Sequence, residues 1–274
     1  MFLVTGANGQ LGQELRLILG DKAVYVDYAD LDITDVAVVR EFGRTRAFEA
    51  IINCAAYTAV DKAESEPEKA QNVNVNGPKN LAETGIPLIH VSTDYVFDGQ
   101  SCRPYKENDL PAPRSVYGRT KLAGEQAVWE RASAAFVFRT AWLYSPFGNN
   151  FVKTMLRLGA ERDVLKVVFD QIGTPTYAAH LAQAIVAALP YLKEGCREVY
   201  HFSNEGVCSW YDFAVEIMAQ GGRNCKVLPI ESKDYPTAAE RPAFSVLNKE
   251  KFKTSFGMEI PHWKKGLEEC LKRF

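Results

Sequence analysis

Tyr117 and Lys121 lie four positions apart in the stretch SVYGRTKLAGE, which begins at Ser115. On an α-helix, this spacing places both side chains on one face. A nearby ammonium group favours the phenolate and lowers the pKa of a tyrosine, which suits the phenol to donate a proton to a ketone oxygen during reduction. The chain has 12 tyrosines. A single Tyr-x-x-x-Lys pair is therefore weak evidence until other residues support it.

A glycine-rich turn near the start of the chain gives this pair a chemical context. The stretch TGANGQLG places Gly6, Gly9 and Gly12 directly after an apolar run and at the start of a helical pattern. Such glycines allow a tight turn, let the backbone approach a pyrophosphate and let the helix pack closely on the strand. The free N–H groups of the helix then attract the phosphates. The sequence predicts a dinucleotide site here, and a plain strand-to-helix turn is the alternative.

Asp27 ends the next apolar run. A carboxylate at this point can accept hydrogen bonds from the hydroxyls of the adenosine ribose, and it repels a 2′-phosphate, which favours NADH over NADPH. The alternative is an ordinary loop carboxylate. Asp32 and Ile33 can contact the adenine, whereas Thr34 or Asp35 can cap the following helix.

Polar side chains also follow the later apolar runs. Tyr57 and Thr58 come after AIINCAA, and Thr93 and Asp94 come after IPLIHVS. In an open α/β sheet, ligands bind beyond the carboxyl ends of the strands. The hydroxyl of Thr93 can donate a hydrogen bond to a substrate carbonyl, although a turn-forming hydroxyl is the alternative. Ser115 can cap the next helix, which would put Tyr117 in its first turn.

The elements that must position these residues follow from hydrophobic periodicity. In the first half of the chain, short apolar runs alternate with helical patterns, which predicts βαβ units and a Rossmann-type doubly wound parallel sheet with helices on both faces. Strands are expected at 1–6, 23–27, 50–56, 86–93 and 135–144, and helices at 10–20, 35–45, 67–85 and from Ser115 onward.

After about residue 145, the regular alternation of apolar runs with helical patterns ends. Helices are expected at 149–161, 176–192, 209–222 and 262–274, with extended segments at 164–170 and 198–204. Residues 1–145 are predicted to form an NAD(P)-binding Rossmann domain, to which segments near 164–200 and 240–250 return. Residues 146–274 are predicted to form mainly a smaller, interleaved α/β substrate-binding cap.

Composition excludes several classes of protein. The chain has 274 residues, a formal net charge of −2 and no Lys/Arg-rich run, which excludes a nucleic-acid or membrane-surface partner. No apolar run has the length of a membrane span, and the start does not resemble a signal peptide. The six cysteines form no C-x-x-C pair, and the four histidines have no metal-ligand spacing. We therefore expect a cytoplasmic protein with reduced thiols and no metal.

The order of these motifs resembles the extended short-chain dehydrogenase/reductase family. The glycines, a hydroxyl residue after the fourth strand and YGRTK occur in the order that this family shows. Within this family, the chain resembles the dTDP-4-dehydrorhamnose reductases over nearly its whole length. The stretches that carry this resemblance are CAAYTAVDKAESEPEKA, STDYVFDG, RTAWLY, GNNFVKTMLR, DQIGTPT and AERPAFSVLN. The resemblance implies NAD(P)H-dependent reduction of the 4-keto group of dTDP-4-dehydro-L-rhamnose to dTDP-L-rhamnose, in polysaccharide biosynthesis.

The resemblance also implies roles for individual residues. Thr93, Tyr117 and Lys121 match the catalytic set. The cofactor positions are Gly6, Gly9, Gln10, Leu11, Gly12, Asp27, Asp32, Ile33, Ala56, Tyr57, Thr58, Val91, Tyr117 and Lys121. The positions for the dTDP-sugar are Thr93, Asp94, Trp142, Asn150, Phe151 and Arg241. A guanidinium suits a diphosphate because it binds through a bidentate fork. Trp142 can pack against a sugar, or it can be a core aromatic residue.

Two positions depart from the family pattern. Tyr57 lies where some relatives have His, and Ala179 lies about where some relatives have a Glu that takes part in a magnesium-bridged dimer. The resemblance therefore predicts a monomer or a weak homodimer without that metal. Two other functions stay open: a non-catalytic regulatory subunit resembling the methionine adenosyltransferase β-subunit, and a reductase or epimerase of another sugar nucleotide. The presence of Thr93, Tyr117, Lys121 and Trp142 together favours the enzyme.

Overall fold

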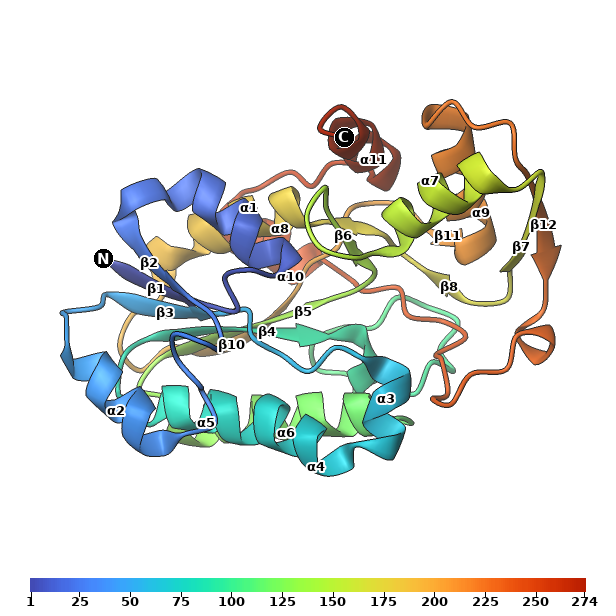
Figure 1. Ribbon diagram of the computed structural model, residues 1–274. Helices are drawn as coiled ribbons and strands as arrows, with labels where there is room; N and C mark the ends of the chain where they lie inside the picture. The colour runs from blue at the N-terminus through green and yellow to red at the C-terminus, as the bar shows by residue number, and fades with distance from the viewer.

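A six-stranded parallel sheet forms the centre of the computed structural model, which describes residues 1–274 (Figure 1). The strand order is β10-β5-β4-β3-β1-β2, and every neighbouring pair is parallel. The strands are β1 (Phe2–Thr5), β2 (Ala23–Val26), β3 (Ala50–Asn53), β4 (Leu88–Thr93), β5 (Ala135–Thr140) and β10 (Arg197–His201). The predicted doubly wound α/β fold class is therefore confirmed.

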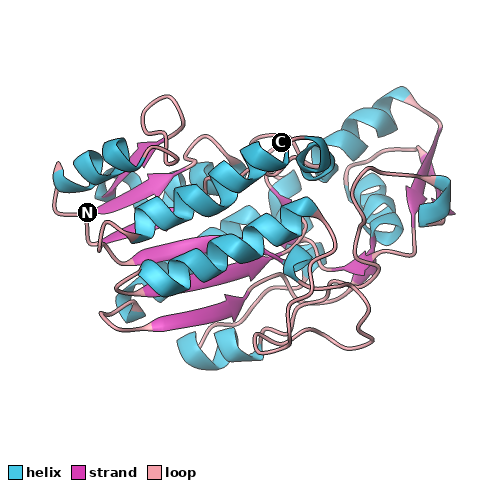
Figure 2. Cartoon of the chain, turned by 90° about the horizontal axis from the view of Figure 1, so that it is seen from below, coloured by secondary structure: helices cyan, strands magenta, loops and turns pink.

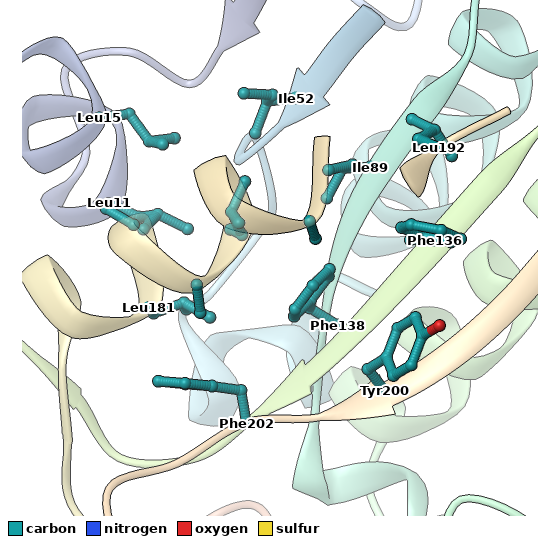
Figure 3. Close-up of a cluster of buried hydrophobic side chains, with 14 of the residues drawn as sticks. Leu11, Leu15, Ile52, Ile89, Phe136, Phe138, Leu181, Leu192, Tyr200 and Phe202 are labelled. Atoms are coloured by element: carbon teal, nitrogen blue, oxygen red, sulfur yellow. The ribbon is translucent and has the colours of Figure 1, made fainter. Parts of the chain in front are cut away.

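Helices cover both faces of the sheet (Figures 1 and 2). On one face lie α1 (Gln10–Leu19), α8 (Ala178–Ala188) and α10 (Glu250–Phe256). On the other lie α2 (Val36–Arg44), α4 (Pro67–Gln71), α5 (Gly77–Ala82) and α6 (Val116–Arg131). Figure 3 shows the core of the first face, where Leu11 and Leu15 of α1 and Leu181 of α8 meet Ile52, Phe136 and Phe138 of the sheet. Alternation of apolar strands with amphipathic helices produces these two layers, because each helix buries its apolar stripe against the sheet.

A second core lies beside the carboxyl ends of the central strands, at the right of Figure 1. Its helices are α7 (Phe151–Glu161), α9 (Trp210–Gln220) and α11 (Trp263–Leu271). Its strands are short and form three pairs: β12 (Lys226–Ile230) with β7 (Val164–Val168), β11 (Cys208–Ser209) with β8 (Ile172–Gly173), and β6 (Leu143–Tyr144) with β9 (Thr176–Tyr177). No helix combines the length and the apolar character needed to cross a bilayer.

The segment 67–85, predicted as one helix, is interrupted. A π-helical turn at Asn72–Asn76 separates α4 from α5. Pro78 has no N–H group to donate to the carbonyl of Asn74, four residues earlier, and its ring would clash with that carbonyl in a regular α-helix. The wider turn removes this clash. A short helix, α3 (Val60–Ser65), precedes this region and was not predicted.

The predicted strand 135–144 is also divided. β5 ends at Thr140, and β6 belongs to a different sheet. Trp142, between them, has a φ of 48°, which is unusual for a residue other than glycine. This kink turns the chain out of the central sheet and into the second core.

Candidate active site

A cleft with a volume of about 840 Å³ lies at the carboxyl ends of the central strands. This size falls within the usual range for small-molecule sites, about 300–1,000 Å³. All fourteen of the predicted cofactor positions line it: Gly6, Gly9, Gln10, Leu11, Gly12, Asp27, Asp32, Ile33, Ala56, Tyr57, Thr58, Val91, Tyr117 and Lys121. The cleft also brings in Thr93, Asp94 and Trp142 from the predicted sugar positions.

The glycine turn between β1 and α1 is shaped by close backbone contacts. Gly6 has a φ of 64°, and a Cβ there would lie 2.6 Å from the backbone nitrogen of Ala55. A Cβ at Gly12 would lie 2.5 Å from the carbonyl oxygen of Gly6. Gly9 caps α1 without a side chain, so the first N–H groups of this helix have no side-chain acceptor. This cradle of backbone N–H groups fits a pyrophosphate.

Asp27 follows β2 and lies at one end of the cleft. Its two carboxylate oxygens accept hydrogen bonds from the backbone N–H groups of Asn8, at 2.9 Å, and Tyr28, at 2.8 Å. These bonds fix the carboxylate beside the glycine turn. Tyr28 is 76% exposed and also lines the cleft, although no sequence motif marked it. Of the two predicted caps for α2, Asp35 is the one that accepts the capping hydrogen bonds.

Tyr117 and Lys121 lie on α6, which Ser115 caps by accepting a hydrogen bond from the N–H of Gly118. The predicted cap and the place of Tyr117 in the first helical turn are both confirmed. The Nζ of Lys121 donates to the carbonyl oxygen of Val91 at 2.7 Å, and the side chain is buried. Burial lowers the pKa of Lys121 to about 8, although the negative charge of Glu125 acts in the opposite direction.

The pKa of Tyr117 differs from the sequence prediction. Burial raises it to about 12, and the negative charge of Asp94 raises it further. The expected lowering by Lys121 is therefore wrong, because the loss of hydration on burial disfavours the phenolate. At neutral pH the phenol thus carries its proton.

Thr93 ends β4, Asp94 directly follows it, and both line the cleft together with Tyr117. The hydroxyl of Thr93 donates to Oδ1 of Asp94 at 3.0 Å and accepts from the N–H of Tyr95 at 3.2 Å. Burial raises the pKa of Asp94 to about 6, against the opposing effect of the hydrogen bond that its carboxylate accepts from Thr93. These two side chains therefore form one hydrogen-bonded unit at the strand end.

Buried polar residues beneath the cleft support it. Glu125 forms a bidentate ion pair with Arg139 of β5, with a shortest distance of 2.7 Å, and also accepts from the hydroxyl of Ser92. Asn74, in the π-helical turn, accepts from the N–H of Tyr57 at 2.8 Å and donates to Oγ1 of Thr120 at 3.1 Å. Apart from Tyr57, none of these residues was among the predicted site residues. Glu125 offered a signal, since it lies one helical turn after Lys121, but nothing local marked Asn74.

Two tryptophans form the opposite end of the cleft. The rings of Trp142 and Trp210 stack with centroids 3.6 Å apart and planes 11° apart, and both line the cleft. Phe151 packs against Trp210, with ring centroids 4.6 Å apart, and does not itself line the cleft. Trp142 is thus a cleft residue rather than a simple core aromatic. Trp210 was missed because it starts a helix that carries no motif.

Two other predicted sugar positions lie outside the cleft lining. Asn150 caps α7, and its amide donates to Oε1 of Gln10 at 3.0 Å, so it joins the second core to the glycine turn. Arg241 forms a bidentate ion pair with Asp61 of α3, with distances of 2.8 and 2.6 Å. Lys121 is therefore the only Lys or Arg among the lining residues. No cluster of three His, Cys, Asp or Glu side chains is placed to hold a metal ion.

Comparisons with known proteins agree with this geometry. The family model described as RmlD substrate binding domain matches residues 1–274. A protein of Aggregatibacter actinomycetemcomitans named dTDP-4-dehydrorhamnose reductase is 42% identical over 97% of this chain and 96% of its own length. A crystal structure of such a reductase from Clostridium acetobutylicum has a TM-score of 0.95 and 43% identity, covering 99% of this chain and 98% of its own. A Bacillus anthracis structure, in complex with NADP, has a TM-score of 0.95 and 40% identity, covering 100% of this chain and 99% of its own.

Proposed function

The chain belongs to the RmlD substrate binding domain family, and from that membership we propose that it reduces the 4-keto group of dTDP-4-dehydro-L-rhamnose to give dTDP-L-rhamnose. The membership confirms the family resemblance seen in the sequence. The observation that carries the proposal is the meeting of Thr93, Tyr117 and Lys121 in one cleft with a pyrophosphate cradle. This combination suits a hydride acceptor whose oxygen must be protonated.

Each of the three residues has a separate task in this proposal. The nicotinamide, when bound, supplies hydride to the carbonyl carbon. Tyr117 donates its phenolic proton to the carbonyl oxygen, and its raised pKa keeps that proton in place before turnover. Lys121 has three N–H donors, of which one is bound to Val91, so two are free for the nicotinamide ribose and for the phenolate that forms.

Thr93 donates a hydrogen bond to the same carbonyl oxygen in this proposal. Its hydroxyl has a single proton, which points to Asp94 in the structure. The hydroxyl therefore rotates towards the ketone when the substrate arrives, and Asp94 becomes free to accept from a sugar hydroxyl. A donor aimed at the developing oxyanion is worth about 10²- to 10³-fold in rate.

We propose a nicotinamide dinucleotide as the cofactor, with NADH slightly favoured over NADPH. The Bacillus anthracis relative was solved in complex with NADP. In the present chain, Asp27 is fixed at the adenosine end, and Lys121, the only Lys or Arg that lines the cleft, is held at the reaction centre. A 2′-phosphate would therefore meet a carboxylate and no cation.

The sugar nucleotide is proposed to occupy the end of the cleft formed by Trp142 and Trp210. Asp94 and Trp142 would contact the sugar, since both line the cleft beside Tyr117. Asn150 and Phe151 lie one layer behind, so they would act by positioning the wall of the cleft. Arg241 is proposed to bind the diphosphate, although it contacts Asp61 in the structure.

The division into domains is also a proposal. We assign residues 1–145 to the cofactor-binding part and residues 146–274 mainly to the cap. Packing of Leu181, Ile185 and Tyr200 into the core of the first part supports the return of the segment near 164–200 to it. Phe252, just beyond the segment near 240–250, packs into the same core. We further propose a cytoplasmic protein that is a monomer or a weak homodimer. Size-exclusion chromatography with light scattering over a range of concentrations tests the oligomeric state.

The decisive experiment follows nicotinamide absorbance with the purified chain, dTDP-4-dehydro-L-rhamnose, and NADH or NADPH in parallel. The proposal expects oxidation of the cofactor and formation of dTDP-L-rhamnose, with the higher kcat/KM for NADH. No oxidation with either cofactor would reject the proposed reaction. Cofactor binding without oxidation would then favour another keto sugar or a non-catalytic binding subunit.

A further inference from the structure

Residues 233–241, which we call the strap, connect the second core to the side of the molecule that carries α3 (Figure 1). One end is anchored where the N–H and hydroxyl of Ser232 both donate to Asp170, at 2.8 and 2.7 Å. The other end is followed by Phe244, whose N–H donates to the carbonyl of Gly99 at 3.1 Å. The strap therefore starts and finishes at fixed points.

Between those points, the strap is tied to one side chain. Asp61 accepts from the N–H of Ala239 at 3.1 Å and from both terminal nitrogens of Arg241, at 2.8 and 2.6 Å. Apart from bonds within the strap and to its neighbours 231 and 232, the hydrogen bonds of its residues all end on Asp61. A single carboxylate thus holds the middle of the strap against α3.

This ion pair lies next to the cleft. Asp61 directly follows Val60, which lines the cleft, and the charges of Arg241 and Asp61 both act on Tyr95, another lining residue. The Arg241 side chain is 21% exposed and that of Asp61 is 46% exposed. Both side chains of the pair are therefore partly open to solvent beside the cleft.

The proposed substrate brings a diphosphate, and the cleft offers no free cation for it. Lys121 is the only Lys or Arg in the lining, and its Nζ is bound to Val91 beside Tyr117. A guanidinium binds a carboxylate and a phosphate through the same fork of N–H donors. In the structure that fork is occupied by Asp61.

We propose that Asp61 is an internal competitor for the substrate, a carboxylate that occupies the fork of Arg241 until the diphosphate of the nucleotide sugar displaces it. The inference rests on the proposed function, because that function supplies the diphosphate. Asp61 then has two effects. It keeps the strap ordered in the free protein, and it lowers the affinity for dTDP by the strength of the ion pair that must be broken.

The test measures dTDP binding by titration calorimetry, with the full chain saturated with NADH. Asp61→Asn keeps an oxygen acceptor for the N–H of Ala239 but removes the competing charge. We expect dTDP to bind about two- to fivefold more tightly, the affinity change that corresponds to breaking one partly exposed ion pair. Arg241→Gln should weaken binding about tenfold or more. Asp61→Asn in the Arg241→Gln background should then change nothing, because the competition is gone.

Asp170→Asn is the matched control, since it loosens the other anchor of the strap without contacting Arg241. It should leave dTDP affinity unchanged. Unchanged or weaker binding by Asp61→Asn, or normal binding by Arg241→Gln, would overturn the proposal and leave the pair as a structural tie. If Arg241→Gln does not fold, Arg241→Lys replaces it, because lysine keeps the charge and loses the fork.

The keto-sugar assay separates this inference from the proposed function. Turnover of dTDP-4-dehydro-L-rhamnose with no effect of Asp61→Asn on dTDP affinity would reject the competitor and keep the reductase. The expected dTDP pattern without turnover would keep the competitor and reject the reaction. Failure of the unchanged chain to bind dTDP would also overturn the competitor.

Discussion

The two ends of the cleft are built in different ways. At the end lined by Asp27, the wall comes from the glycine turn and from residues 27–34, so its parts are neighbours in the first βαβ unit. At the other end, Trp142 and Trp210 come from different elements and meet only through tertiary packing. Backbone geometry therefore shapes the first end, whereas side-chain packing between distant segments shapes the second.

The two ends of the cleft also differ in the energetic constraints on their residues. At the glycine turn, a Cβ would collide with backbone atoms, so the shape tolerates little change of residue type. At the tryptophan end, the backbone of Trp142 is strained, with a φ of 48°. The same residue stacks its ring on Trp210. We therefore expect substitutions at the two ends to affect different ligands.

The largest expected effect lies where the two ends meet. Tyr117→Phe removes the proton donor but keeps the ring that packs edge-on against Tyr95, with centroids 5.4 Å apart. We expect kcat to fall by about 10²- to 10⁴-fold, with little change in the affinity for NADH or dTDP. Stopped-flow absorbance and calorimetry measure these quantities. Tyr95→Phe is the matched control and should retain most of kcat, while near-normal kcat in Tyr117→Phe would reject the assigned donor.

A pH profile gives the next largest effect. Because burial lowers the pKa of Lys121 to about 8, its ammonium group loses the proton as pH rises through that value. We expect kcat/KM to fall about tenfold per pH unit above about 8, the limit for loss of one essential proton.

Stability should change in the opposite direction over that range. In the unfolded chain, Lys121 keeps its proton up to the ordinary lysine pKa of 10.5. Between about pH 8 and 10.5 the unfolded chain therefore binds more protons than the folded chain. The contribution of Lys121 to the free energy of unfolding consequently rises with pH over this range. Urea unfolding at several pH values separates this effect from inactivation by unfolding. A rate that stays flat to about pH 10 would contradict the role of the ammonium group.

Trp210→Ala tests the tryptophan end on its own. The loss of a stacked ring from the cleft wall should raise KM for the sugar nucleotide by about tenfold and leave NADH affinity unchanged. Steady-state kinetics and a NADH titration measure the two quantities. Trp129→Ala, at an exposed position of α6, is the control for removal of an indole outside the cleft. Equal losses for both ligands would show that the two ends do not act independently.

Asp27→Ala should have the smallest effect and should act only at the other end. It removes the carboxylate that Asn8 and Tyr28 fix, so the ratio of kcat/KM for NADPH to that for NADH should rise by about five- to tenfold. Asp35→Ala, which weakens the cap of α2, should leave this ratio unchanged. An unchanged ratio in Asp27→Ala would remove the basis for the proposed preference for NADH.

The same contrast explains how far the sequence could predict the molecule. The sheet, the glycine turn, the cap at Ser115 and the place of Tyr117 depend on local patterns, and these predictions are confirmed. All of the predicted cofactor positions line the cleft because parallel strands end at one edge of the sheet. Their roles in binding stay predictions.

Features that depend on tertiary contacts were predicted less well. Trp210 and Asn74 were not selected, because their partners lie on other elements. Arg241 was selected for its chemistry, yet its partner Asp61 is 180 positions away in the chain and has no sequence signal that relates it to the strap. The pKa of Tyr117 was predicted in the wrong direction because burial cannot be judged from the spacing of Tyr117 and Lys121.

The π-helical turn at Asn72–Asn76 has a consequence for how the length of this segment can vary. A π turn holds one more residue than the α turn it replaces, and each residue of an α-helix rotates the chain by about 100°. The angular phase of α4 relative to α5 therefore depends on the number of residues between them rather than on their identity. A one-residue deletion here would rotate every side chain of α4 away from its neighbours, so the length of this segment constrains the packing of α4 more strongly than its composition does.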